Sequence, residues 1–166
     1  SPNREEALAE IRNTLGLVVH TNKELEQVFD FYINNSFDLV PVQKNSKAPM
    51  EKDWTNKEHK TKDEWKMWRE RGLNIGVKTG KCSNITVIDL DDLEAAKEVL
   101  PLLNKTCTQK TNKGIHYFYK YEEDLGKTRL EKYKLDIEND GGQVVIEPSE
   151  IDGIKRTIEK VEIASM

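Results

Sequence analysis

The segment that most constrains this chain is residues 84–92, in which a run of β-branched and apolar residues ends in acidic ones. Side chains at positions i and i+2 of a strand point to the same face and lie about 6.6 Å apart along it. The pattern therefore predicts a strand that presents the carboxylates of Asp89 and Asp91 side by side. The opposite face of this strand carries Thr86, Ile88 and Leu90. We expect that face to pack in the core and the acidic face to form a site.

Two interpretations of the acidic residues stay open at this level. Carboxylates at this spacing can bridge a pair of divalent cations about 3.5–4 Å apart, an arrangement that stabilises the attacking and leaving oxygens of phosphoryl transfer. Alternatively, Asp91 or Asp92 simply caps a following helix, since Asp is a preferred N-cap residue and an acidic residue suits the first turn. An EF-hand is excluded because Glu94 stands where that loop requires glycine.

Composition favours one globular, intracellular protein. The 166 residues suffice for one compact unit, and the net charge of −4 argues against coating nucleic acid through bulk electrostatics. A local basic surface remains compatible with that charge, because carboxylates gathered around metals lower the net charge of the apo chain. Neither an apolar run of about 18 residues nor a signal-like start is present, so we expect a cytoplasmic location and no membrane. The start at Ser1 leads us to expect a piece of a longer protein, and Cys82 and Cys107 fit neither a zinc site nor a disulfide framework.

Hydrophobic periodicity predicts helices early in the chain and strands later. Helical spacing predicts helices over residues 3–15, ending at Gly16, and from an N-cap at Thr21 or Asn22 to residue 33. The remaining early predictions are a strand over 37–43, a surface loop over 44–60, a helix opened by a Thr61/Glu64 capping box and closed by Gly72, strands over 74–79 and 85–91, and a helix over 93–103. Pro41 suggests that the strand over 37–43 lies at a sheet edge or a bulge.

The second half of the chain predicts hairpins. Strands over 106–110 and 115–121 are expected to pair around the turn at residues 111–114. Residues 122–133 are charged and predict a loop, and strands over 134–138 and 143–147 are expected to form a second hairpin around residues 139–142. A strand-like stretch over 157–163 ends the series. The predicted class is α+β around a mostly antiparallel sheet.

Two further residues are candidates for the same site. His116 lies in a predicted strand, where a lone histidine is more often structural, but Lys110, Lys113 and the glycine turn just upstream supply donors and positive charge suited to phosphate oxygens. Asp136 would add a third carboxylate from another strand, as a metal pair held by Asp89 and Asp91 would need. The alternative for Asp136 is an edge strand with one polar face.

In this order, the segments resemble the catalytic core of the archaeo-eukaryotic primase superfamily, and within it the bifunctional primase-polymerase domains. The resemblance covers roughly residues 37–155, and its strength lies in the ordered series. The matching pieces are Val40-Pro41-Val42, Lys47-Ala48-Pro49 with Trp54, residues 74–80, Val87 to Asp91, Thr111 to Phe118, Leu135-Asp136-Ile137, Asp140-Gly141-Gly142, Val144 to Ser149, and Asp152-Gly153. The chain departs from the family pattern at Asn112, where glycine is frequent, and at Glu147, where a small residue commonly precedes the proline.

The resemblance implies the role of each candidate residue. Asp89, Asp91 and Asp136 would hold two Mg²⁺ or Mn²⁺ ions, and His116 would contact the incoming triphosphate. Thr111, Lys113 and Ser149 occupy positions where the family places phosphate or nucleotide contacts.

The resemblance also implies an architecture: an RRM-like sheet joined to a small N-terminal α/β module, with the active site in the cleft between them. The expected division is N-terminal helices over residues 1–36, packing on a catalytic core over residues 37–166. The implied partners are a DNA template and primer, nucleoside triphosphates, and a helicase or other domains of the full-length protein.

The resulting hypothesis is a DNA primase/polymerase that transfers nucleotides by a two-metal mechanism and initiates chains. One alternative is a two-metal nuclease or phosphohydrolase that uses the same carboxylates with water as the nucleophile. The other alternative is a non-catalytic RRM-like module that stacks bases on Tyr117, Phe118 or Tyr119.

Overall fold

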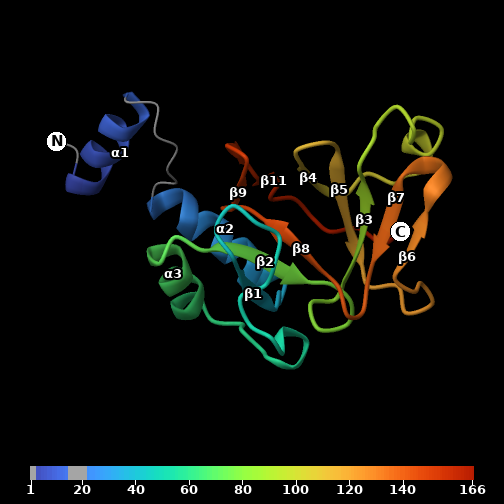
Figure 1. Ribbon diagram of the computed structural model, residues 1–166, viewed down its shortest axis with the longest axis horizontal. Helices are drawn as coiled ribbons and strands as arrows, with labels where there is room; N and C mark the ends of the chain where they lie inside the picture. The colour runs from blue at the N-terminus through green and yellow to red at the C-terminus, as the bar shows by residue number, and fades with distance from the viewer. Residues whose placement is uncertain (1–2, 15–21) are drawn as a thin grey trace.

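Helices gather in the first part of the chain and strands in the second, as Figure 1 shows for the computed structural model, which describes residues 3–14 and 22–166. The helices are α1 (Arg4–Thr14), α2 (Asn22–Asn34) and α3 (Lys62–Glu70), with short 3₁₀ helices at Trp54–Asn56, Leu100–Leu102 and Glu131–Tyr133. The strands are β1 (Leu39–Val42), β2 (Asn74–Lys78), β3 (Ile85–Leu90), β4 (Cys107–Lys110), β5 (Ile115–Lys120), β6 (Thr128–Leu130), β7 (Leu135–Glu138), β8 (Gln143–Ile146), β9 (Glu150–Ile151), β10 (Ile154–Lys155) and β11 (Thr157–Ile158).

The strands form two main sheets and one short hairpin, and every strand pair is antiparallel. The smaller sheet has the order β1-β2-β8, and the larger has the order β11-β4-β5-β3-β7-β6, while β9 and β10 pair with each other. The predicted α+β class with a mostly antiparallel sheet is therefore confirmed. None of the helices in the described residues is long and apolar enough to cross a membrane.

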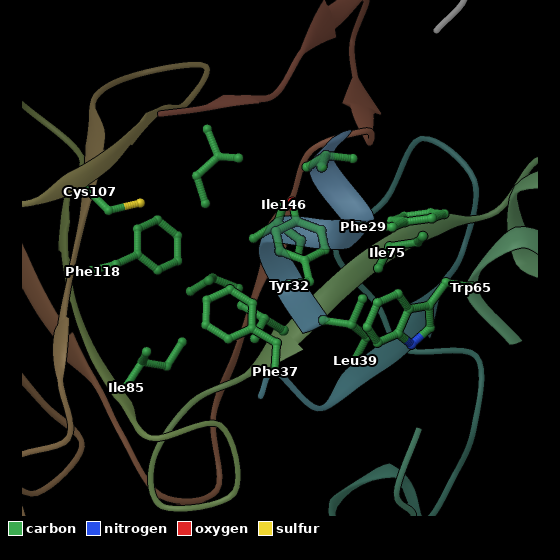
Figure 2. Close-up of a cluster of buried hydrophobic side chains, with 14 of the residues drawn as sticks. Phe29, Tyr32, Phe37, Leu39, Trp65, Ile75, Ile85, Cys107, Phe118 and Ile146 are labelled. Atoms are coloured by element: carbon green, nitrogen blue, oxygen red, sulfur yellow. The ribbon is translucent and has the colours of Figure 1, made fainter. Parts of the chain in front are cut away.

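One hydrophobic core joins the two sheets. Figure 2 shows Phe29 and Tyr32 of α2 packed with Trp65 of α3 against the smaller sheet, and the same cluster continues to Cys107 and Phe118 of the larger sheet. All five side chains are fully buried. Burial of an aromatic or large aliphatic side chain contributes about 1.5–3 kcal/mol, so this shared cluster holds the sheets in a fixed relation.

The outer face of β3 has a separate cover, as its alternation predicts. Ile88 and Leu90 pack with Ala96, Tyr119 and Leu135 in a second cluster. The cover is not the α-helix predicted over residues 93–103, which was wrong. That segment forms successive turns and the 3₁₀ helix at 100–102. Pro101 contributes to the difference at the end of this segment, because proline has no N–H with which to continue an α-helix.

The predicted hairpin over residues 134–147 is also wrong, although its turn exists. β7 pairs with β3 in the larger sheet, and β8 pairs with β2 in the smaller one, so residues 139–142 cross between sheets. This turn is hydrogen-bonded to the connection between β2 and β3, which also passes from one sheet to the other. The Thr79 N–H donates to the Gly142 carbonyl (2.9 Å), and the Lys81 N–H donates to Asp140 (2.9 Å). Local turn residues identify the turn but not the strand partners on either side of it.

Several other predictions are confirmed. β4 and β5 pair around the turn at 111–114, and β1 is an edge strand that contains Pro41. α3 begins at Lys62, but the Thr61 hydroxyl donates to the Glu64 carboxylate (2.7 Å) instead of capping the backbone.

Residues 122–133 were predicted as loop alone, whereas β6 and a 3₁₀ helix lie there, and the strand expected over 157–163 shortens to β11. Gly16 and Thr21 lie outside the described residues.

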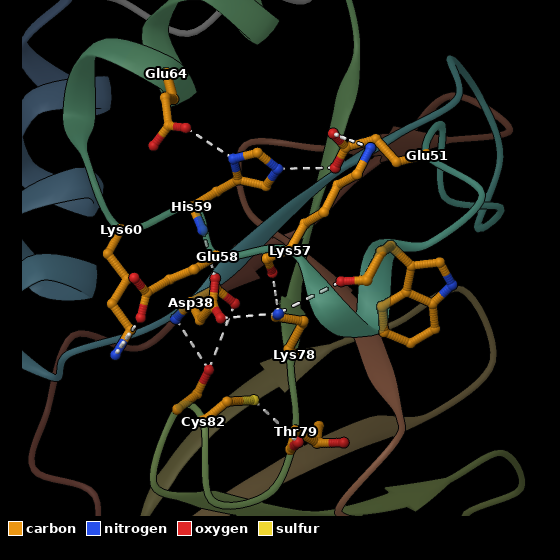
Figure 3. A network of polar contacts seen from close by, with 12 residues as sticks. Asp38, Glu51, Lys57, Glu58, His59, Lys60, Glu64, Lys78, Thr79 and Cys82 are labelled. Carbon is orange, nitrogen blue, oxygen red and sulfur yellow. Dashed lines mark hydrogen bonds and ion pairs between the residues drawn. The ribbon is translucent and has the colours of Figure 1, made fainter.

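A buried polar network fixes the loop over residues 44–60, as Figure 3 shows. Lys78 of β2 and Asp38 form an ion pair of 2.9 Å whose side chains are only 6% and 3% exposed. Lys78 also donates to the carbonyls of Trp54 and Lys57, and the Asp38 carboxylate accepts the His59 N–H at 2.8 Å. Because buried charges need partners, these contacts tie the end of the loop to the smaller sheet.

Candidate active site

Antiparallel register places five polar residues in one row across the larger sheet. Asp89 of β3 lies directly opposite His116 of β5 on one side and opposite Asp136 of β7 on the other. The row extends to Gln109 of β4, opposite His116, and to Arg129 of β6, opposite Asp136. Directly opposite Cβ atoms are about 4.5–5.5 Å apart. The register alone therefore brings these side chains within reach of one another.

Three carboxylates meet at the centre of this row. One oxygen from each of Asp89, Asp91 and Asp136 lies within 4.8 Å of the other two. Asp91 joins the cluster because it follows Asp89 by two residues on the same face, and its N–H donates to the Lys134 carbonyl at 3.2 Å.

The cluster fits a divalent cation by its donor chemistry. Carboxylate oxygens are the ligands that Mg²⁺ and Mn²⁺ prefer. Asp89 Oδ1 is buried, and its contact with His116 Nε2, at 3.3 Å, does not reach hydrogen-bond geometry. A buried carboxylate oxygen with so weak a contact is costly, and a bound cation would stabilise it.

The surrounding charges act differently on the two neighbouring carboxyls. Burial alone would raise the pKa of Asp89, but His116 and the charges of Lys47 and Arg156 outweigh burial and lower that pKa below its ordinary value. The pKa of Asp91 is raised, first by burial and then by the negative charges of Asp89 and Asp136. Repulsion within the cluster is therefore concentrated at Asp91, and a bound cation would relieve it.

His116 is held between two members of the row. Its Nε2 lies 3.3 Å from Asp89 Oδ1, and its Nδ1 lies 3.2 Å from Gln109 Nε2. Two backbone contacts fix the orientation of the Gln109 amide: Oε1 accepts the Glu147 N–H (3.1 Å) and Nε2 donates to the Val145 carbonyl (2.9 Å). The amide therefore presents a donor to His116.

Arg129 closes the acidic end of the row and was missed by the sequence-based prediction. Its NH1 lies 2.8 Å from Asp136 Oδ2 and 3.6 Å from Asp91 Oδ2, while its Nε lies 2.6 Å from Glu131. Residues 122–133 were predicted as a loop, so nothing in the sequence placed Arg129 near the carboxylates. Its role becomes visible only when β6 is known to pair with β7.

Two adjoining pockets open beside the row. The inner pocket, of about 170 Å³, is lined by Asp89, Asp91 and His116 from the larger sheet and by Gln143, Val144 and Val145 of β8, so it lies between the sheets. The outer pocket, of about 580 Å³, includes Asp91, Asn112, Lys113, Arg129 and Lys134. Both pockets are also lined by Lys47, Thr111 and Arg156.

The structure brings together most of the predicted site residues. Thr111 lines both pockets, and its hydroxyl accepts the Gly114 N–H at 2.9 Å, which shapes the turn that carries Lys113 into the outer pocket. Ser149 is not brought into either lining. It is fully buried, and its hydroxyl accepts the Ile75 N–H (2.7 Å) and donates to the Ile75 carbonyl (3.0 Å).

Lys47 and Arg156 were also missed as site residues. Lys47 belongs to a Lys-x-Pro motif that gave no chemistry by itself, and it enters the site because Gln143 of β8 donates to its carbonyl at 2.9 Å. Arg156 stands in a short stretch between β10 and β11, for which the sequence predicted no element and no site. Each is recognised only when the two sheets are seen to converge on Asp89.

Asp92 serves the capping role considered for the acidic segment. Its Oδ1 accepts the N–H groups of Glu94 (3.0 Å) and Ala95 (3.1 Å), which stabilises the turn after β3. Asp91 takes no part in that cap. The acidic segment therefore serves both purposes that were considered for it. Asp92 caps the turn, and Asp89 and Asp91 belong to the carboxylate cluster.

Comparison with known proteins places the chain by family. A family model described as "Bifunctional DNA primase/polymerase, N-terminal" matches residues 30–166. The match begins within α2 and includes every strand, and with them all the residues of the two pockets. None of the curated proteins compared with the chain matches it.

Proposed function

The chain belongs to the bifunctional DNA primase/polymerase (Prim-Pol) family, and from this membership we propose that it is a template-directed nucleotidyltransferase. It would join nucleoside triphosphates to a 3′-hydroxyl on a DNA template, and de novo primer synthesis would be part of the same activity. The observation that carries the proposal is the cluster of Asp89, Asp91 and Asp136 beside His116, at the junction of the two sheets. A DNA primase/polymerase-type function in general follows from the family.

Asp89, Asp91 and Asp136 would hold two Mg²⁺ or Mn²⁺ ions in this proposal. When bound, such ions activate a 3′-hydroxyl and neutralise charge on the transferred phosphate. Asp89 and Asp136 come from two hydrogen-bonded strands of one sheet, and Asp91 follows the first of these strands directly, so their positions are fixed before any ligand arrives. Electrostatic stabilisation by preorganised groups of this kind is commonly the largest contribution to catalysis.

His116 and Lys113 would bind the triphosphate. The Gln109 amide occupies Nδ1 of His116, which directs an Nε2–H donor toward Asp89 and the inner pocket. A phosphate oxygen beside the carboxylate cluster would accept this hydrogen bond, and the Lys113 ammonium would stabilise charge on departing pyrophosphate. Thr111 would contribute by shaping the turn and by lining both pockets.

Ser149 takes a different part in the proposal. Because its hydroxyl is engaged by both backbone groups of Ile75, we assign it to positioning, in place of the nucleotide contact implied by the family resemblance. Its carbonyl accepts the Arg156 N–H at 2.8 Å, so it fixes the backbone from which Arg156 reaches the pockets.

The proposed architecture keeps the larger sheet as an RRM-like unit, the smaller sheet with its helices as the second module, and the active site as the cleft between them. The division into N-terminal helices over residues 1–36 and a core over 37–166 stays a prediction, as does a helicase partner. DNA would enter along the outer pocket, where Lys47, Lys113 and Lys134 offer positive charge to phosphates.

Base stacking on Phe118 or Tyr119 is not supported. Phe118 is fully buried in the core that joins the sheets, and Tyr119 is fully buried under residues 93–103. Stacking on either ring would require that ring to be accessible. Tyr117, partly buried against the same cluster, lies in a parallel stack with Tyr119, with ring centroids 6.3 Å apart.

Gel-resolved incubation of a labelled primer on DNA templates of defined sequence tests the proposal. With Mn²⁺ and one nucleotide at a time, the primer should lengthen only with the nucleotide complementary to the template. Shortening of the strand with Mn²⁺ alone would instead indicate a two-metal nuclease, which the same carboxylates can support with water as the nucleophile. An unchanged primer under both conditions would count against both enzymes.

A further inference from the structure

Arg156 is a buried cation whose guanidinium lacks the partners that burial requires. The residue is 1% exposed, and neither Nε nor NH1 has a hydrogen-bond partner among the described residues. Arginine is almost never fully buried unless paired, because an unpaired charge loses its hydration without compensation. The arrangement therefore calls for a ligand that the chain itself does not supply.

No acidic residue in the described part of the chain accepts a hydrogen bond from Nε or NH1 of Arg156. The acidic group whose charge acts on Arg156 is Asp89, whose Oδ1 lies 3.3 Å from His116 Nε2 and has no well-formed hydrogen bond among the described residues. Two opposite charges thus face the same pocket without closing a hydrogen bond between them, which leaves room for an intervening ligand.

Arg156 lies where the two pockets meet. It lines the inner pocket with Asp89 and His116, and the outer pocket with Lys113. Lys47 and Thr111 line both. An anion at this junction would have cations on several sides and the carboxylate cluster on another. Such a place suits a phosphate that is shared between metal ions and basic side chains.

We propose that Arg156 binds a non-bridging phosphate oxygen of the nucleoside triphosphate at the junction of the two pockets, with Lys47 as its neighbour. The planar guanidinium offers parallel N–H donors that match a phosphate, which a lysine at the same position could not reproduce. This inference rests on the proposed function for the identity of the ligand as a nucleotide. The anion site itself follows from the burial, the unpartnered donors and the pockets.

Stability without ligand provides a first test, because an unpartnered buried charge destabilises the empty protein. Arg156→Met, which replaces the charged group by an apolar side chain of similar length, should therefore melt at a higher temperature than the parent in EDTA. The matched control is Lys155→Met, which removes the same charge one residue away and outside both pockets. A melting temperature that falls for Arg156→Met, together with unchanged anion binding, would show a structural role and overturn the proposal.

Binding of inorganic tripolyphosphate with Mg²⁺ at low ionic strength, measured by calorimetry, provides the second test. We expect Arg156→Met to bind about 10- to 100-fold more weakly than the parent, and Lys155→Met to bind like the parent. Arg156→Lys keeps the positive charge but not the parallel N–H donors, so its affinity should fall between those of the parent and Arg156→Met. This variant also tests the proposal if Arg156→Met does not fold. Equal affinity in all variants, or no binding by the parent, would overturn the proposal.

The two proposals fail separately. A parent that extends primers, with tripolyphosphate binding unaffected by Arg156→Met, would remove the anion site and leave the polymerase. A parent that binds tripolyphosphate through Arg156 but never extends a primer would remove the polymerase and leave the anion site.

Discussion

The side-chain amide of Gln109 donates to Nδ1 of His116 across 3.2 Å, and this contact fixes which ring nitrogen carries the proton. The amide cannot turn over, because its oxygen is engaged by the Glu147 N–H and its nitrogen by the Val145 carbonyl. His116 Nδ1 must then act as an acceptor, so the neutral ring carries its proton on Nε2, facing Asp89.

Gln109→Met should release this restraint. We expect two-bond ¹H–¹⁵N spectra to show the Nε2–H tautomer of His116 in the parent and a mixture of tautomers in the variant. Primer extension should show a several-fold higher KM for nucleotide. Thr108→Val is the control, since it removes a hydrogen bond to Glu159 from the adjacent residue of β4, whose side chain points to the other face. An Nδ1–H tautomer in the parent would refute the assignment.

Arg129 should compete with metal for the carboxylates. Its guanidinium contacts Asp136 and Asp91, so a cation that binds there must offset the loss of these contacts. Arg129→Gln should therefore bind Mn²⁺ about 2- to 5-fold more tightly in calorimetry without nucleotide, the range expected for a partly exposed ion pair. Lys127→Gln is the control, because it removes a positive charge whose Nζ lies 3.9 Å from Glu138 Oε2. It should change Mn²⁺ affinity less. Weaker binding in Arg129→Gln would speak against competition.

Gly114 allows the turn over residues 111–114 to approach the end of β3. A Cβ at this position would lie 1.7 Å from the Leu90 carbonyl oxygen, which is backbone and cannot move independently. Gly114→Ala should cost about 1–3 kcal/mol of stability in urea unfolding and lower primer extension, because the turn that bears Lys113 must shift away from Asp91. Gly126→Ala, where a Cβ meets nothing within 4 Å, should leave both unchanged. Equal stability of the two variants would contradict this account.

His59 should make stability depend on pH. Its Nδ1 lies 2.7 Å from Glu64 and its Nε2 lies 2.8 Å from Glu51, as Figure 3 shows. Burial alone would lower the pKa of His59, but the hydrogen bonds and charges of Glu64 and Glu51 outweigh it and raise that pKa above 6.5. A raised pKa means that folding favours the protonated ring. The resulting stabilisation is complete below the unfolded-state pKa and is lost as pH rises through the folded-state value.

The measurement is urea unfolding of the parent and His59→Gln at pH 6, 7.5 and 9, followed by tryptophan fluorescence. The difference in unfolding free energy should be largest at pH 6 and shrink towards pH 9. A difference that stays constant across this range would show that the imidazolium charge does not contribute.

The sequence predicted those features of the site that depend on alternation within one strand. The acidic face of β3, the apolar face of Ile88 and Leu90, and the turn at residues 111–114 all follow from side-chain periodicity and turn chemistry. Pairing is a different matter, because a strand pattern does not name its partner. The predicted hairpin over 134–147 failed for that reason, since each of its strands pairs in a different sheet.

The same limit explains which site residues escaped prediction. Gln109 and Arg129 gain their roles from register with His116 and Asp136, and Lys47 and Arg156 gain theirs from the convergence of a loop and a short connection on one pocket. Ser149 shows the opposite error. Its position in a motif suggested a ligand contact, but burial commits its hydroxyl to the backbone of β2.

Primer extension by Asp89→Asn tests the central claim most directly. The substitution keeps the shape of the side chain and removes only its charge, and Asp63→Asn on the exposed side of α3 is the matched control. Thermal melts by circular dichroism check that both variants stay folded, since Asp89→Asn weakens the contact of Asp89 Oδ1 with His116 Nε2 at 3.3 Å. The account predicts extension by the parent and by Asp63→Asn, and a rate at least about 1,000-fold lower for Asp89→Asn. Extension by Asp89→Asn at the parent's rate would contradict it.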